Sequence, residues 1–352
     1  MSVAVRSAPP PRTEEELEDR LSEPRDATVE AIRKAPGDII VLGAGGKMGP
    51  TLARMAARAA ERADGTNRRR VIAVSRFTSR DVRRVLAEHG VETIACDLLD
   101  AAAVARLPEA PNVVFMAGQK FGTSDAPSRT WMMNVFVPAH CARRYAGARI
   151  VAFSTGNVYP LVPVDGRGAN ENTTPAPVGE YAASCLGRER VFEFFATTAA
   201  TRVAIMRLNY AIDLRYGVLT DLAYRIVRKE PIPVAMGRVN VIWQGDANRV
   251  ALELLPLASS PPLVVNVSGA DALSVRTLSI ELGRRLGEGI EPRFQGTEAA
   301  DALLTDTSRM RALLGEPEMR LETLLDWVAD WVGSGRPLLG KPTHFETRDG
   351  SF

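Results

Sequence analysis

The sequence is poor in the residues that build metal centres and disulfide frameworks. Its 352 residues include 3 cysteines and 3 histidines, and neither set has the spacing of a zinc site or a disulfide pattern. This scarcity predicts no bound metal and a reducing, cytoplasmic compartment. No apolar run approaches the ~20 residues that span a bilayer. The N-terminus lacks the apolar core of a signal peptide, so neither a membrane partner nor secretion is expected.

Lysine is scarce as well, and the overall charge is nearly balanced. The formal net charge is +2, from 44 basic and 42 acidic residues, which gives no reason to expect a nucleic-acid partner. Arginine carries almost all of the positive charge, because the only lysines are Lys34, Lys47, Lys120, Lys229 and Lys341. A lysine beside a motif is therefore a candidate functional residue.

What the sequence does contain is a glycine cluster between an apolar run and a stretch with helical periodicity. Gly43, Gly46 and Gly49 have the spacing of a strand–turn–helix unit that lets the backbone approach a pyrophosphate. The positive end of the helix dipole then faces the phosphates. Lys47 and Met48 fill the same turn and are predicted cofactor contacts. Lys47 either reaches a phosphate or is a solvated turn residue.

Apolar segments and helical stretches alternate after this turn. Continuous apolar strands separated by helices predict an α/β fold, a doubly wound Rossmann-type parallel sheet with ligands at the carboxyl ends of its strands. Strands are predicted at 39–42, 71–74, 93–95, 113–116, 150–153 and 203–206, and helices at 48–62, 79–88, 100–106, 128–145 and 180–198.

The same pattern divides the chain into four regions. The first is an N-terminal arm whose helix, at 13–21, is charged, which favours a solvated surface helix over one that covers the sheet or contacts a second subunit. After the sheet the alternation is less regular, with further strands predicted at 239–243 and 263–267, and a smaller C-terminal α/β substrate domain is expected. The regions are 1–36 (arm), 37–210 (dinucleotide-binding domain, to which 238–262 returns), 211–333 (mainly substrate domain) and 334–352 (polar tail).

The end of the second strand bears on the choice of cofactor. Ser75 and Arg76 stand where this fold usually has a carboxylate that holds the adenosine ribose hydroxyls. A hydroxyl and a guanidinium suit a ribose 2′-phosphate, since arginine binds phosphate through charge-assisted hydrogen bonds. We therefore expect NADP to be preferred over NAD; the alternative is that Arg76 is only surface charge. Asp97 and Leu98, which follow the third strand, are predicted to flank the adenine.

Two further segments, taken with the glycine turn and Asp97, resemble the extended short-chain dehydrogenase/reductase family. This is the NAD-dependent epimerase/dehydratase group, which acts mostly on nucleotide sugars. The segment at 115–122 is similar to the stretch after the fourth strand in UDP-galactose 4-epimerases. The resemblance implies that Ala117, Gly118 and Lys120 lie along the cofactor.

The second segment, at 153–159, is similar to the strand-five motif of the same family. The resemblance implies that Thr155 lies at the reacting centre and Asn157 beside the substrate. It also implies substrate contacts for Asn209, which stands one place before the family's asparagine, and for Arg293 in the substrate domain. Family members often dimerise through the helices at 128–145 and 180–198, so a homodimer is possible.

The catalytic pair of this family is a tyrosine followed four residues later by a lysine, and here Tyr181 is followed by Cys185. A free tyrosine has a pKa near ~10, which a neighbouring ammonium lowers. Three interpretations stay open: Lys120 or Arg188 supplies the cation, Tyr181 acts mainly as a hydrogen-bond donor, or the protein binds dinucleotide without redox chemistry. Cys185 itself is interpreted as a small buried filler rather than a nucleophile.

The sequence thus favours an NAD(P)-dependent oxidoreductase, epimerase or dehydratase that moves a hydride between nicotinamide and a sugar-like substrate, with Thr155 and Tyr181 as catalytic residues. The segment 239–243 lacks the arginine with which the family grips a nucleotide diphosphate. A free sugar or sugar acid is therefore as good a candidate as a nucleotide sugar. The alternative is a catalytically degenerate NADP-binding sensor that signals through its N-terminal arm or C-terminal tail.

Overall fold

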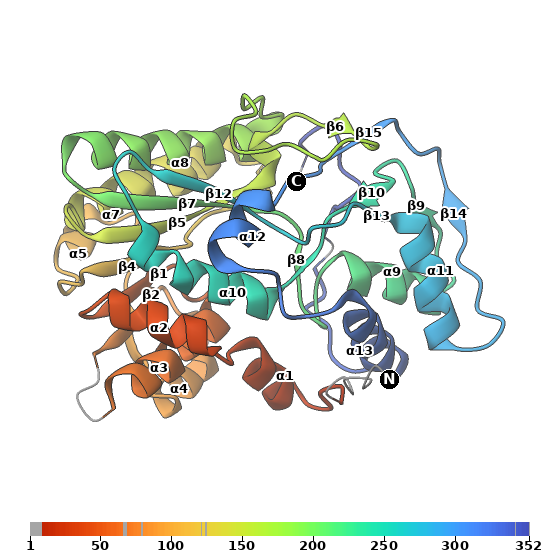
Figure 1. Ribbon diagram of the computed structural model, residues 1–352, viewed down its shortest axis with the longest axis horizontal. Coiled ribbons are helices and arrows are strands. Elements are labelled where there is room, and N and C mark those ends of the chain that lie inside the picture. The colour runs from red at the N-terminus through yellow and green to blue at the C-terminus, as the bar shows by residue number, and fades with distance from the viewer. Residues whose placement is uncertain are drawn as a thin grey trace.

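The fold is built on a parallel sheet of seven strands, at the left of Figure 1. A computed structural model describes residues 9–65, 69–78, 80–120, 122–123, 125–341 and 343–351. The strands are β1 (Ile39–Leu42), β2 (Val71–Ser75), β3 (Glu92–Ala95), β4 (Asn112–Phe115), β5 (Arg149–Thr155), β7 (Arg202–Leu208) and β12 (Leu263–Val267). Their order, β12-β7-β5-β4-β1-β2-β3, reverses direction between β1 and β4. This is the doubly wound topology, which places a ligand crevice at that reversal.

Helices cover both faces of the sheet because its strands are apolar on both sides. In β1, Ile39 and Val41 join the core under one helical layer, whereas Ile40 and Leu42 join the core under the other. Among the described residues, no helix has the length and apolar character that a bilayer crossing requires. The first layer holds α2 (Asp26–Lys34), α3 (Gly49–Asp64), α4 (Arg80–Glu88) and α10 (Gln244–Glu253); the second holds α5 (Ala101–Ala105), α6 (Pro127–Trp131), α7 (Val137–Arg144) and α8 (Gly179–Thr198).

A second unit, at the right of Figure 1, packs α9 (Val218–Val227), α11 (Val275–Leu286) and α13 (Leu321–Gly333) around a core of their own. Short strand pairs connect it to the sheet domain, and α12 (Ser308–Leu314) lies against β12. The pairs are β8 (Ala211–Ile212) with β11 (Ile242–Trp243), β10 (Arg238–Val239) with β13 (Leu273–Ser274), β9 (Ile232–Pro233) with β14 (Phe294–Gln295), and β6 (Val162–Pro163) with β15 (Asp301–Ala302).

The predicted strand at 239–243 is wrong, because the chain leaves the extended pairing at Asn240. The buried Asn240 side chain accepts a hydrogen bond from the Thr305 backbone N–H (2.8 Å) and donates one to the Asp271 carbonyl (3.1 Å). These contacts separate β10 from β11, which pair in different sheets. The segment that returns to the main sheet was predicted to end at residue 262. It ends later, because β12 also belongs to this sheet, where it pairs with β7.

The helix predicted at 128–145 is continuous but not uniform. It contains a π-helical turn, η1, at Met132–Phe136 between α6 and α7. The wider turn carries Asn134, whose Oδ1 accepts a hydrogen bond from the Gln119 N–H (2.8 Å) and whose Nδ2 donates to the Gln119 carbonyl (2.9 Å). Such π-turns often occur at functional sites. This one fixes the loop that follows β4.

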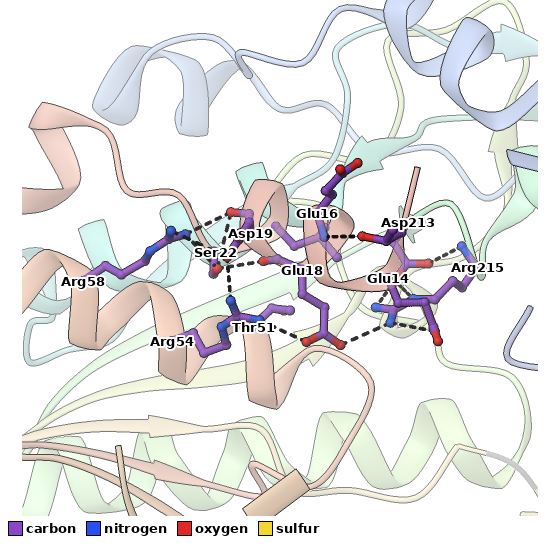
Figure 2. Close-up of polar contacts among 12 residues, drawn as sticks. Glu14, Glu16, Glu18, Asp19, Ser22, Thr51, Arg54, Arg58, Asp213 and Arg215 are labelled. Atoms are coloured by element: carbon purple, nitrogen blue, oxygen red, sulfur yellow. Dashed lines mark hydrogen bonds and ion pairs between the residues drawn. The ribbon is translucent and has the colours of Figure 1, made fainter. Parts of the chain in front are cut away.

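The N-terminal arm is packed into the structure, so the expectation of a solvated helix is wrong. Helix α1 (Glu14–Leu21) buries Leu17 and Leu21 completely in the core of the C-terminal unit. Its charged side chains form ion pairs within the chain (Figure 2). Glu18 pairs with Arg54 of α3 (3.0 Å) and with Arg215 of the loop after β8 (3.2 Å). The helix therefore joins the cofactor-side helix α3 to the C-terminal unit.

The polar tail also lies on the protein rather than in solvent. Phe345 is 2% exposed and belongs to the core of the C-terminal unit. The Leu339 N–H donates to the Arg215 carbonyl (3.1 Å), and the Thr343 N–H donates to the Asp221 carboxylate (2.9 Å). Near its end the tail reaches the beginning of α8, which carries Tyr181.

Candidate functional site

A cavity of about 280 Å³ opens beside the glycine turn, at the carboxyl ends of the central strands. It brings together many predicted cofactor contacts: Gly43, Gly46, Ser75, Arg76, Asp97, Leu98, Ala117 and Gly118. Seven further lining residues were not predicted from the sequence: Gly45, Phe77, Thr78, Val82, Cys96, Met116 and Met133. Gly45, Cys96 and Met116 are next in sequence to predicted contacts, so their positions in the chain could have identified them as lining residues.

The turn has no room for a side chain at two of its glycines. Gly43 has a φ of +93°, and a Cβ there would lie 2.5 Å from the Ala117 nitrogen. A Cβ on Gly45 would meet the Ser75 hydroxyl at 2.4 Å. No side chain caps the beginning of α3, so its first N–H groups point to the turn without a capping acceptor. A pyrophosphate fits this combination of bare backbone and helix N-terminus.

Part of the cavity is lined by Ser75, Arg76 and Thr78 from the segment after β2. Ser75 is half-buried and Arg76 is exposed. The carboxylate in this region is Asp97, which follows β3 rather than β2 and accepts a hydrogen bond from the Leu99 N–H (3.1 Å). A hydroxyl and a guanidinium thus stand at the end of β2, where a 2′-phosphate would lie.

The end of β5 and the first turn of α8 place Thr155 next to Tyr181. The two side chains are hydrogen-bonded, and the Tyr181 hydroxyl also interacts with the Cys185 thiol. Asn157 donates to the Thr155 hydroxyl from its backbone N (3.2 Å) and its Nδ2 (3.3 Å). Burial raises the pKa of Tyr181 above its ordinary value, so the hydroxyl stays protonated at neutral pH.

Two cations lie near Tyr181. The Lys120 ammonium lies 5.9 Å from the centre of the Tyr181 ring, and its charge acts on the Cys185 thiol. Burial lowers the pKa of Lys120 to about 8. Arg188 is buried and donates to the Phe153 carbonyl (2.8 Å) and to Asn134 Oδ1 (2.7 Å). Cys185 is itself 1% exposed and burial raises its pKa, as a small core residue requires.

The remaining predicted residues lie outside the cavity lining. Asn209 is buried, donates to the Leu303 carbonyl (3.3 Å) and packs against Gly156, next to Thr155. Arg293 is exposed and comes just before β14, the strand at the outer edge of the C-terminal unit in Figure 1. Lys47 leans away from the cavity and places its ammonium 3.1 Å from the centre of the Tyr216 ring.

Met48 flanks the cavity without lining it and packs against the sheet core that α3 covers. Lys120 and Tyr181 also lie beyond the lining residues, towards the reacting centre. Across the described ranges, no group of three or more histidine, cysteine, aspartate or glutamate side chains is placed to hold a metal ion.

Comparison with known proteins identifies the family. The model of the NAD-dependent epimerase/dehydratase family matches residues 39–237, more than half of the chain. A search of curated protein sequences finds no match.

Many solved structures share the fold. UDP-glucose 4-epimerase from Thermotoga maritima, solved with UDP-glucose, is 19% identical with a TM-score of 0.69, covering 85% of this chain and 99% of that one. The dTDP-glucose 4,6-dehydratase DesIV from Streptomyces venezuelae, with bound NAD, is 19% identical with a TM-score of 0.71, covering 84% and 97%. MoeE5, in complex with UDP-glucuronic acid and NAD, is 21% identical with a TM-score of 0.69, covering 85% and 100%.

Proposed function

Because the chain belongs to the NAD-dependent epimerase/dehydratase family, we propose that it is an NAD(P)-dependent enzyme acting on a sugar-like substrate. The reaction is hydride transfer, in an oxidoreductase, epimerase or dehydratase, at a hydroxyl-bearing carbon. The observation that carries the proposal is the hydrogen-bonded pair of Thr155 and Tyr181 at the end of β5, beside a cavity with a dinucleotide-binding turn. When bound, the nicotinamide accepts or supplies the hydride.

Different residues would hold different parts of the cofactor. Gly43, Gly46 and the first turn of α3 would hold the pyrophosphate, and Ala117 and Gly118 would lie along its nicotinamide half. Ser75 and Arg76 would hold the adenosine end, with Asp97 and Leu98 at the adenine. Lys47, from the same turn, places its ammonium over the Tyr216 ring, and its contact with a phosphate stays a prediction.

The protein groups at the reacting centre suit proton transfer to and from a substrate oxygen. Tyr181 would donate its proton to that oxygen in the reductive direction and take it back in the oxidative direction. Thr155 would hydrogen-bond the same oxygen, oriented by Asn157. Lys120 would supply the positive charge that offsets negative charge on the Tyr181 oxygen. This combines two of the three interpretations: a tyrosine donor and a substituted cation.

The proposal is tested first by the choice of cofactor. Arg76→Ala is expected to weaken NADP binding by about 10- to 100-fold, since a charge-assisted hydrogen bond contributes about 1.5–3 kcal/mol. NAD, which has no 2′-phosphate, should bind both proteins equally. Titration calorimetry with each dinucleotide measures this. Arg284→Ala is the control, because Arg284 is exposed on α11 and pairs with Glu281. Equal loss for NADP and NAD would contradict the 2′-phosphate role of Arg76.

We also propose a homodimer through the helices η1 and α8. Large apolar side chains are exposed there: Phe136 is 47% exposed and Phe194 is 60% exposed, with Trp131 and Met132 alongside on α6 and η1. Phe136→Glu is expected to convert the dimer to a monomer, because it buries a charge in the interface. Light scattering after gel filtration measures the mass. Ile280→Glu, at an exposed apolar position of α11, should leave the mass unchanged. A wild-type monomer would refute the dimer.

A further inference from the structure

Residues 343–351, the last that the structure describes, run from the C-terminal unit to the sheet domain. They begin in the C-terminal unit, where the Thr343 backbone N–H donates to the Asp221 carboxylate of α9 (2.9 Å) and Phe345 is buried in the core. They end against the beginning of α8. We call residues 343–351 the strap, because it is fixed at both ends.

The far end of the strap contacts α8 through two glycines. Gly350 and Gly179 both have a positive φ, +76° and +80°. A Cβ on Gly179 would lie 2.5 Å from the Gly350 carbonyl oxygen, and a Cβ on Gly350 would lie 2.2 Å from the Val178 carbonyl oxygen. Neither glycine can carry a side chain unless the two backbones move apart. This contact comes two residues before Tyr181 in the chain.

Between its ends, the strap is held by an arginine. Arg348 forms an ion pair with Asp301 of β15, and it donates to the Asp301 carbonyl (2.9 Å) and the Ala235 carbonyl (3.3 Å). β15 pairs with β6, the next strand in the chain after β5, which ends at Thr155. The strap is therefore attached to the C-terminal unit, to β15 and to the beginning of α8.

The strap also contacts the end of β7, near the other catalytic residue. The Tyr210 hydroxyl donates to the Phe345 carbonyl (3.4 Å). Tyr210 has a φ of +45°, which is rare for an aromatic residue and indicates that its surroundings hold it in place. The adjacent Asn209 packs against Gly156, next to Thr155. The strap thus touches sequence neighbours of both proposed catalytic residues, one on the sheet and one on α8.

We propose that the strap is a lid that closes the reacting centre, and that substrate enters and leaves when the far end of the strap separates from α8. A closed site favours hydride transfer, because excluding water strengthens electrostatic interactions and prevents side reactions. The far end is the part that opens, since a backbone contact and the Arg348 ion pair hold it, whereas Phe345 is buried in a core. This inference rests on the proposed function, since the lid closes the same reacting centre.

The test is the quenching of bound NADPH fluorescence by acrylamide, an uncharged molecule that must reach the nicotinamide ring. Gly350→Ala places a methyl group against the Val178 carbonyl, so the quenching constant should rise at least about twofold. Arg348→Gln removes the ion pair with Asp301 and should also raise it. Gly340→Ala is the matched control in the same tail. Gly340 also has a positive φ (+62°), but in the described part of the chain only its own neighbours lie within 4 Å of its Cβ position.

Hydrogen exchange followed by mass spectrometry measures the opening of the strap itself. The amides of residues 346–351 should exchange at least about tenfold faster in Gly350→Ala than in the wild type, and at an unchanged rate in Gly340→Ala. Unchanged exchange or unchanged quenching in Gly350→Ala overturns the proposal, and so does an equal rise in Gly340→Ala. A wild-type protein that does not bind NADPH contradicts the proposed function and the lid together. Tight NADPH binding with the same quenching in every variant contradicts the lid alone.

Discussion

Tyr181→Phe is expected to lower turnover by about 10²- to 10⁴-fold, the usual contribution of a positioned acid–base group. The substitution removes only the hydroxyl that bonds to Thr155, and the ring keeps its place in the buried site. NADPH affinity should therefore change little, and the loss should fall on kcat. The loss of kcat is measured in single-turnover experiments that follow the reduced nicotinamide. The substrate is one found by screening acidic sugars. Tyr224→Phe, on an exposed tyrosine of α9, is the matched control.

The pH profile of the same reaction tests the cation beside Tyr181. Because the pKa of Lys120 is lowered to about 8, its ammonium is present below that pH and is lost above it. Turnover in the reductive direction should therefore fall as the pH rises through about 8. Lys120→Met should lower turnover at neutral pH and abolish this alkaline limb. If the turnover of Lys120→Met still falls as the pH rises through about 8, the titration belongs to another group. The titratable neighbours of Lys120 are Lys47 and Cys185.

Unchanged turnover in Tyr181→Phe would contradict the catalytic assignment of the tyrosine. A different result, tight NADPH binding with no turnover of any sugar or sugar acid by the wild type, would favour the alternative of a cofactor-binding sensor. That alternative predicts a partner whose binding is lost when the N-terminal arm is deleted. Since α1 buries Leu17 and Leu21, such a deletion also needs a folding control by circular dichroism.

Glu189→Gln is expected to destabilise the fold by about 3–5 kcal/mol, the cost of leaving a buried charge without its partner. Glu189 and Arg207 form a two-pronged ion pair at 2.6 and 2.9 Å, with side chains 2% and 5% exposed. Arg207 also donates to the Tyr159 hydroxyl (2.7 Å), and Ser154 donates to Glu189. The pair joins α8 to the end of β7, and the hydrogen bond from Ser154 extends it to the end of β5, next to Thr155. Urea denaturation measures the free energy of unfolding.

A matched comparison separates burial from charge. Glu193→Gln removes an exposed carboxylate from the same helix, where it pairs with Arg190, and should change the free energy of unfolding by less than about 1 kcal/mol. The double variant Glu189→Met with Arg207→Met should be less destabilised than Glu189→Gln, because it leaves no buried charge unpaired. If Glu189→Gln is no more destabilising than Glu193→Gln, the buried pair does not hold β7 and α8 together.

The sequence alone determined the sheet domain, because its evidence is local. Apolar runs, glycine spacing and helical periodicity depend on residues a few positions apart, and they placed β1, β2 and β5 within one or two residues of their observed bounds. The same kind of evidence failed at 239–243. There, a buried asparagine bonds to Asp271 and Thr305, which are distant in the chain, and it interrupts an otherwise strand-like pattern.

The partners of charged side chains were the hardest feature to predict. The pattern of charges along the sequence does not indicate where a charged side chain will point. The acidic helix of the arm looks solvated in sequence, yet Glu18 bridges Arg54 and Arg215 in the folded chain (Figure 2). Lys120 was predicted as a cofactor contact, and the structure adds its position beside Tyr181 and Cys185. In each case the partner comes from a distant segment of the chain.

The sequence by itself thus determined an α/β sheet domain with a glycine turn typical of dinucleotide binding, and it predicted a catalytic role for Tyr181, with Cys185 at the position where a lysine is expected. Only the tertiary structure decided which charges surround that pair. It brings Lys120 to Tyr181, and it places the Lys47 ammonium over the ring of Tyr216, which follows β8. The physical reason is range: backbone structure follows from neighbours in sequence, whereas the electrostatics of a site sum over every charge that folding brings within reach.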